Sequence, residues 1–207
     1  MDANTGEAVA DLGPRQRARR WLAQRGLRQW WKAGIAAILA IAALFGGLDT
    51  VNTSVTSFEP GEKFSDNAFT VTVQRARLVP EVRAGDTVVA AAKPGRAYLG
   101  VVATLRNDGT VPGRLEGELD LREQPGSHLV GVMRTADGSR AITLGPGLQE
   151  EFAYVWEIAE SDLAAGDSVS LRVWDKTFKQ GFVVYGELWV DSITEYGEVV
   201  VPVGGAQ

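Results

Sequence analysis

The chain has 207 residues, a formal net charge of −5, one histidine and no cysteine. The lack of cysteine excludes a disulfide framework, a lipid-modified cysteine, a thiolate nucleophile and a cysteine-ligated metal. A single histidine also excludes a histidine-rich metal site and the His-Glu-x-x-His zinc motif, so we expect no cofactor and no metal.

The N-terminal region is basic. Residues 1–13 are small and polar, without periodicity, and predict a disordered cytoplasmic tail. Residues 14–32 are interpreted as a juxtamembrane segment, because the first 32 residues hold seven Lys and Arg against three Asp and Glu, a net charge of +4. Such a charge favours contact with anionic lipid head groups.

Residues 33–48 contain no charged or polar side chain and predict a single transmembrane helix. At 1.5 Å per residue they cover about 24 Å, and Trp30, Trp31 and Lys32 extend the helix toward the roughly 30 Å of a hydrocarbon core. The positive-inside rule then places the N-terminus in the cytoplasm and the rest of the chain outside the cell membrane. A cleaved signal peptide is the alternative, although its basic region would be unusually long.

One face of the predicted helix carries small residues. Ala36, Ala40, Ala43 and Gly47 follow one another at spacings of 4, 3 and 4, which places them in one stripe. Small residues let helix backbones approach closely in lipid, so this stripe is a candidate interface with another membrane protein or with a second copy of the chain. The alternative is that alanine and glycine are common in the membrane helices of GC-rich organisms.

A stalk is predicted at residues 49–57, an extracytoplasmic β domain at 58–203 and a short tail at 204–207. Alternation of apolar and polar residues over 115–121, 152–158 and 169–173 is typical of half-buried antiparallel strands.

Three further segments of this domain give local predictions. Residues 98–105 are apolar on both faces, which predicts a central strand. The apolar positions of residues 69–78 shift phase once, which indicates a β-bulge. Residues 160–165 predict one helical turn at most. Together these elements predict an all-β antiparallel sandwich.

The turns between the predicted strands are rich in Asp, Asn and Gly. Calcium prefers oxygen ligands from such loops, so a calcium site is an alternative to the expectation of no metal. Aspartate and asparagine are also favoured in turns for local hydrogen bonding. The turn residues concerned are Asp86, Asn107, Asp108, Asp137 and Asp167.

Part of the domain resembles the immunoglobulin-like modules of bacterial surface proteins, of the adhesion-related type. The resemblance covers about residues 98–175 and rests on three motifs. They are a hydrophobic strand ending in Asn-x-Gly ("YLGVVATLRNDGTVPGRL"), a Leu-x-Pro-Gly turn before an amphipathic strand ("LGPGLQEEFAYVWEI") and a Gly-Asp turn before a further strand ("AAGDSVSLRVWD"). It implies an immunoglobulin-like sandwich ectodomain and assigns a role to no residue.

Two clusters are candidate sites. Glu116, Glu118 and Asp120 would share one face of a strand, which predicts a solvated acidic stripe rather than a catalytic carboxylate pair. The aromatic residues of the C-terminal segment form a candidate partner surface, with an ordinary core role as the alternative. These residues are Phe178, Phe182, Tyr185 and Trp189.

An enzyme is not expected. His128 is the one histidine, no G-x-S-x-G elbow is present, and His128 lies in a predicted loop. Residues 49–207 carry 14 basic and 23 acidic residues, a net charge of −9, which disfavours nucleic acid.

The leading hypothesis is therefore a single-pass membrane protein that contacts the lipid bilayer and acts through protein–protein contacts. In this reading it is an accessory subunit of a bacterial membrane complex. The alternative is an extracytoplasmic module that binds a peptide, a glycan or a small molecule.

Overall fold

The computed structural model describes residues 53–180 and 187–205, which belong to one compact unit beginning at residue 52. This part of the chain is all-β and contains no helix. The strands are β1 (Ser54–Ser57), β2 (Phe64–Ser65), β3 (Phe69–Val79), β4 (Val82–Ala84), β5 (Thr87–Ala90), β6 (Arg96–Asn107), β7 (Gly113–Arg114), β8 (Asp120–Leu121), β9 (His128–Arg134), β10 (Thr143–Leu144), β11 (Gln149–Ala159), β12 (Ser168–Gln180) and β13 (Glu187–Gly204).

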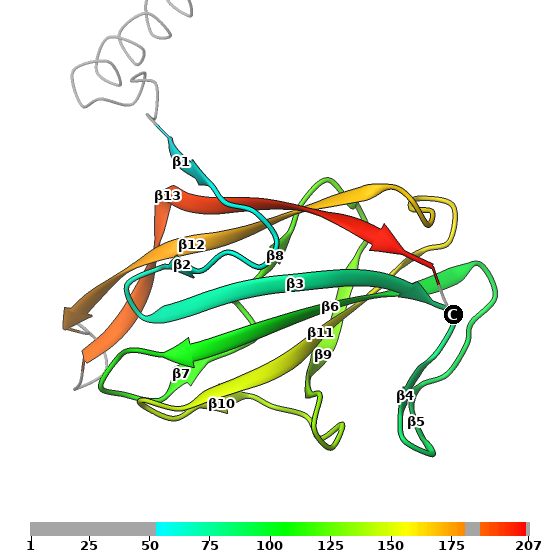
Figure 1. The fold of residues 1–207 in the computed structure, drawn as a ribbon, viewed down its shortest axis with the longest axis horizontal. Helices are drawn as coiled ribbons and strands as arrows, with labels where there is room; N and C mark the ends of the chain where they lie inside the picture. The colour runs from blue at the N-terminus through cyan, green and yellow to red at the C-terminus, as the bar shows by residue number, and fades with distance from the viewer. Residues whose placement is uncertain (1–52, 181–186, 206–207) are drawn as a thin grey trace, which may run out of the picture. The chain divides into compact units, whose positions relative to one another are not determined.

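The strands form two layers that meet along β13 (Figure 1). One layer contains β1, β13, β12 and β8, and the other contains β2, β3, β6, β11 and β9. Two small two-stranded sheets, β4–β5 and β7–β10, stand outside these layers. The predicted β-sandwich architecture is thereby confirmed.

The second layer follows the sequence pattern closely. β6 lies between β3 and β11, as the run of residues apolar on both faces predicted. The register of β3 against β6 shifts between Val73 and Arg75, so the predicted β-bulge is present at Gln74. Buried side chains of this layer, such as Val71 and Phe152, meet those of the first layer, such as Leu171, in one hydrophobic core.

Two pairings depart from the antiparallel prediction. β1 runs parallel to β13, and β13 runs parallel to the end of β3 through Val203 and Gly204. β1 lies within residues 49–57, the predicted stalk. Ser54–Ser57 therefore belong to the sheet, where they pair with residues 195–198. Parallel pairing needs partners from distant parts of the chain, and no local turn signal announces it.

One other local prediction was wrong. Residues 115–119 form a turn rather than a strand, with the Glu118 amide donating to the Leu115 carbonyl at 3.2 Å, and only Asp120 and Leu121 pair as β8. The loop buries Leu115 and Leu119 by folding over the core, which mimics the alternation of a strand. Residues 160–165 also form turns, closed by the Asp162 amide on the Ala159 carbonyl.

The predicted transmembrane helix at residues 33–48, with its small-residue stripe, lies outside the described residues. Within residues 53–180 and 187–205, no helix is long and apolar enough to cross a bilayer.

Candidate functional site

A groove of about 510 Å³ lies between the loop that follows β6 and the first residues of β13. Its size is within the range of pockets that hold a small ligand or a side chain of a partner. Apolar and charged side chains line it together: Phe69, Val111, Leu188, Trp189, Glu118 and Lys176.

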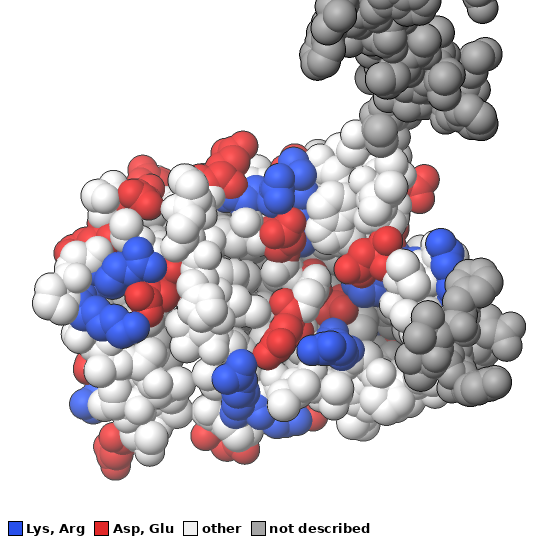
Figure 2. Space-filling model, turned by 180° about the vertical axis from the view of Figure 1, so that it is seen from behind, with Lys and Arg blue, Asp and Glu red and all other residues white. Residues whose placement is uncertain are grey.

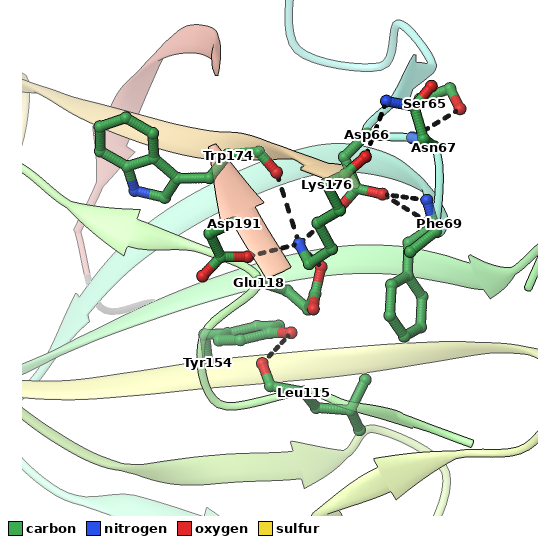
Figure 3. A network of polar contacts seen from close by, with 11 residues as sticks. Ser65, Asp66, Asn67, Phe69, Leu115, Glu118, Tyr154, Trp174, Lys176 and Asp191 are labelled. Atoms are coloured by element: carbon green, nitrogen blue, oxygen red, sulfur yellow. Dashed lines mark hydrogen bonds and ion pairs between the residues drawn. The ribbon is translucent and has the colours of Figure 1, made fainter. Parts of the chain in front are cut away.

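A buried ion network forms the charged part of the groove (Figure 3). The Lys176 ammonium donates to Asp66 Oδ2 at 2.7 Å and to Glu118 Oε2 at 2.9 Å. All three side chains are buried, and the Asp66 side chain is fully covered. The Trp174 carbonyl at 3.4 Å and the half-exposed Asp191 carboxylate at 3.5 Å complete the surroundings of the ammonium.

Asp66 is positioned by the tight turn between β2 and β3. Its carboxylate accepts the amides of Ala68 at 2.8 Å and Phe69 at 2.5 Å, which is the usual way for aspartate to stabilise a turn. Asn67 takes the left-handed conformation with φ of 78° and donates its side-chain amide to the Lys176 carbonyl. Because the Lys176 amide also donates to the Asp66 carbonyl at 2.7 Å, the turn is fixed to β12 by backbone as well as charge.

Lys176 is positioned by an irregularity in the β12–β13 pair. Trp174 pairs with Tyr196 but Lys176 pairs with Asp191, so four residues of β13 lie opposite Asp175 alone. This irregularity places Lys176 inward. Burial raises the pKa of Asp175, and the charges of Glu195 and Asp66 raise it further.

Burial and charge oppose each other within the network. Burial raises the pKa of Glu118 well above its ordinary value, and this effect outweighs the nearby Lys176 charge, while the Asp66 charge adds to it. Burial lowers the pKa of Lys176, but the charges of Glu118 and Asp66 outweigh burial and raise it overall. Lys176 therefore stays charged, and Glu118 takes up a proton more readily than an ordinary glutamate.

Tyr154 connects the groove to the core. Its hydroxyl donates to the Leu115 carbonyl at 2.8 Å and so fixes the loop that carries Glu118. Burial, followed by the charges of Glu118 and Asp66, raises the pKa of Tyr154 well above its ordinary value. The phenol stays protonated and acts as a structural donor.

Two residues of the candidate aromatic surface lie in the described part of the chain. Phe178 of β12 and Trp189 of β13 pack with ring centroids 4.9 Å apart; Trp189 lines the groove and also packs against the core. Leu188 beside it is exposed. Phe182 and Tyr185 lie outside the described residues.

The indole N–H of Trp189 is buried and has no acceptor within residues 53–180 and 187–205. A Cβ placed on Gly109 would lie 2.9 Å from this nitrogen, so glycine allows the indole to approach the loop.

The predicted acidic stripe is wrong for Glu118, because the loop turns this side chain inward onto Lys176. Glu116 and Asp120 keep partly exposed positions at the surface, where they pair with Arg140 and Arg122. No sequence signal identified the network itself, since Asp66 and Lys176 are 110 positions apart.

Three of the turn residues proposed as calcium ligands, Asn107, Asp137 and Asp167, accept amide hydrogen bonds within their own turns. Asn107 donates to the carbonyls of Val111 and Leu144, and Asp137 accepts the Ser139 amide. In the described residues, no three acidic, histidine or cysteine side chains form a metal-binding group. The exposed His128 lies at the start of β9, opposite Glu157 in the ladder with β11.

Acidic and basic side chains are interspersed on the face seen in Figure 2, without a large region of one sign. Opposite charges also lie next to each other in the groove, where three carboxylates surround the Lys176 ammonium. Such an arrangement holds a loop in place and presents an apolar wall.

No protein-family model matches the chain, and no curated protein matches its sequence. The fold is similar to the crystal structure of an uncharacterized β-sandwich protein from Clostridium difficile 630. That alignment has 10% sequence identity and a TM-score of 0.51, and it covers 73% of this chain and 97% of the other.

A conserved hypothetical protein from Bacillus anthracis aligns at 16% identity with a TM-score of 0.34, over 55% of this chain and 85% of the other. At such identities the first similarity shows a β-sandwich fold and nothing of the activity.

Proposed function

We propose that this chain is a single-pass membrane protein whose extracytoplasmic β-sandwich binds another protein through the groove beside β13, as an accessory subunit of a membrane complex. The partner in this proposal is a membrane protein or a second copy of the chain. The predicted helix at residues 33–48 supplies the anchor, and its small-residue stripe supplies a second contact in the bilayer.

The observation that carries the proposal is a groove with exposed apolar side chains on one side and charged side chains at its base that already form ion pairs with one another. Leu188 is 42% exposed and Trp189 is half-buried at the wall, while Lys176 and Glu118 neutralise each other at the floor. Apolar side chains at the centre with satisfied polar groups around them are typical of protein-binding surfaces.

A ligand-binding module is the second candidate, and the volume of the groove favours it. A small polar ligand would need free hydrogen-bonding groups in the groove, whereas the charged groups there bind one another. We further propose that the domain is related to the immunoglobulin-like adhesion modules. We also propose that the chain is not an enzyme.

The test compares two exposed leucines. Leu188→Glu places a charge on the apolar wall, and Leu148→Glu makes the same change at a residue that is 53% exposed and does not line the groove. Full-length protein carrying each variant would be purified from membranes in mild detergent after crosslinking in cells. We expect Leu188→Glu to lose a crosslinked partner that wild type and Leu148→Glu retain. Equal crosslinking by all three proteins would contradict the groove as the contact.

A further inference from the structure

One segment in the described part of β13 contributes no side chain to the core or to the groove. Residues 192–195, here called the corner segment, are the four residues of β13 opposite Asp175. Figure 1 shows β13 turning sharply where β1 lies against it. The Ser192 hydroxyl accepts the amides of Thr194 at 3.2 Å and Glu195 at 3.0 Å, which fixes the turn.

At this turn Ile193 points away from the protein. It is 87% exposed, the highest value among the exposed large hydrophobic residues of the described chain. Five of those eight residues belong to β1 or β13, so exposed apolar surface is concentrated on this pair of strands. Single exposed apolar side chains are common on protein surfaces, so the exposure of Ile193 becomes informative through its position beside the point where the chain enters β1.

The chain connectivity identifies what lies nearby. Ser54 pairs with Glu195 in a parallel register, so the residues before Glu195 extend toward the side from which the chain enters β1. Only residues 49–53 separate β1 from the predicted helix ending at Leu48, a reach of at most about 21 Å. The corner segment is therefore confined close to the bilayer if the helix is the anchor.

We infer that the corner segment is a membrane contact, in which Ile193 enters the interfacial region of the same bilayer that holds the anchor. This inference rests on the proposed membrane anchoring. Because the anchor keeps the domain at the surface, a single apolar side chain is enough to bias its orientation. Asp191 and Glu195 flank Ile193, and their charge favours zwitterionic over anionic lipid.

This orientation has a consequence for the groove. Leu188 and Asp191 precede the corner segment by only a few residues on β13 and line the groove. A domain held by Ile193 would therefore keep the groove near the membrane surface. The partner segment that fits there is the membrane-proximal part of another membrane protein.

The test uses the absence of native cysteine. Ile193→Cys and, as a control, Leu148→Cys would each be labelled with an environment-sensitive fluorophore in the full-length chain. Leu148 is a matched control because it is also an exposed apolar residue, in the turn between β10 and β11. The proteins would be reconstituted into phosphatidylcholine vesicles that contain a nitroxide-labelled lipid as quencher.

We expect the label at position 193 to be quenched at least about twofold more than the label at position 148, with a blue-shifted emission. Vesicle flotation separates the two hypotheses. If both proteins float with the vesicles and the two labels are quenched equally, the membrane contact of the corner segment is overturned while the anchor stands. If neither protein floats, the proposed anchoring fails and the inference fails with it.

Discussion

Replacing Lys176 by methionine tests whether the buried network holds the groove together. Methionine keeps an apolar side chain of similar length, so the change mainly removes the charge and three donors. Asp66 would keep its two backbone donors, at 2.8 and 2.5 Å, but Glu118 would lose the cation that opposes its burial.

The expected magnitude follows from this geometry. Removing one partner of a buried ion pair costs about 3–5 kcal/mol, because an uncompensated charge remains inside the protein. For a domain of this size, 1 kcal/mol shifts Tm by about 2–4 °C, so we expect a loss of roughly 6–20 °C. Since Glu118 can take up a proton, the loss should become smaller as the pH falls.

The assay is thermal unfolding of residues 53–207 followed by circular dichroism near neutral pH and near pH 5. Lys179→Met is the matched control, because Lys179 is an exposed lysine on the same strand and its loss should change stability by no more than about 0.5 kcal/mol. Adding Glu118→Leu to Lys176→Met should restore part of the loss. A Tm for Lys176→Met equal to that of the control would refute the reasoning.

The other predictions use the same fragment. Residues 53–207 should fold alone with a β-type circular dichroism spectrum, and an unchanged Tm in chelator would argue against a calcium site. Gly113→Ala should cost about 1–3 kcal/mol, because the added Cβ collides with the buried Phe69 ring. Gly117→Ala in the same loop, where the Cβ has open space, should cost much less in the same melt. Glu118→Gln tests the pKa direction. The pKa of Glu118 in the folded protein is raised above the ordinary 4.5. This carboxyl group therefore contributes to stability at pH values below 4.5, and the contribution is lost as the pH rises from 4.5 through the folded-state pKa. The wild-type free energy of unfolding should therefore fall across this window in urea titrations, and the variant should lack that part of the fall.

The sequence predicted the parts of the fold that depend on local pattern. In β11 and β12 the sequence alternates between apolar and polar residues, and in β6 it is apolar on both faces, as expected for a central strand. The bulge in β3 is visible in the sequence as a shift in the phase of the apolar residues. The parallel β1–β13 pair could not be predicted this way, because it depends on which distant segments meet at an edge of the sheet.

The candidate site was predicted less well. Trp189 and Phe178 were identified by composition, but Glu118 was placed on a solvated face. A loop that buries Leu115 and Leu119 between polar residues has the same pattern as a strand, and only the tertiary structure distinguishes them. The partners of Glu118 come from a turn and from β12, so the network has no spacing in the sequence that could reveal it.

The parallel pairing of β1 with β13 also determines how mechanical force would pass through this domain. A pull on the chain ahead of Ser54, directed along β1, would shear all of its ladder hydrogen bonds to residues 195–198 together instead of opening them one at a time. Strand β13 would receive that force first, and the same strand carries Leu188 and Asp191 at the groove. In the proposed arrangement, tension between the anchor and a partner in the groove would therefore pass through β13.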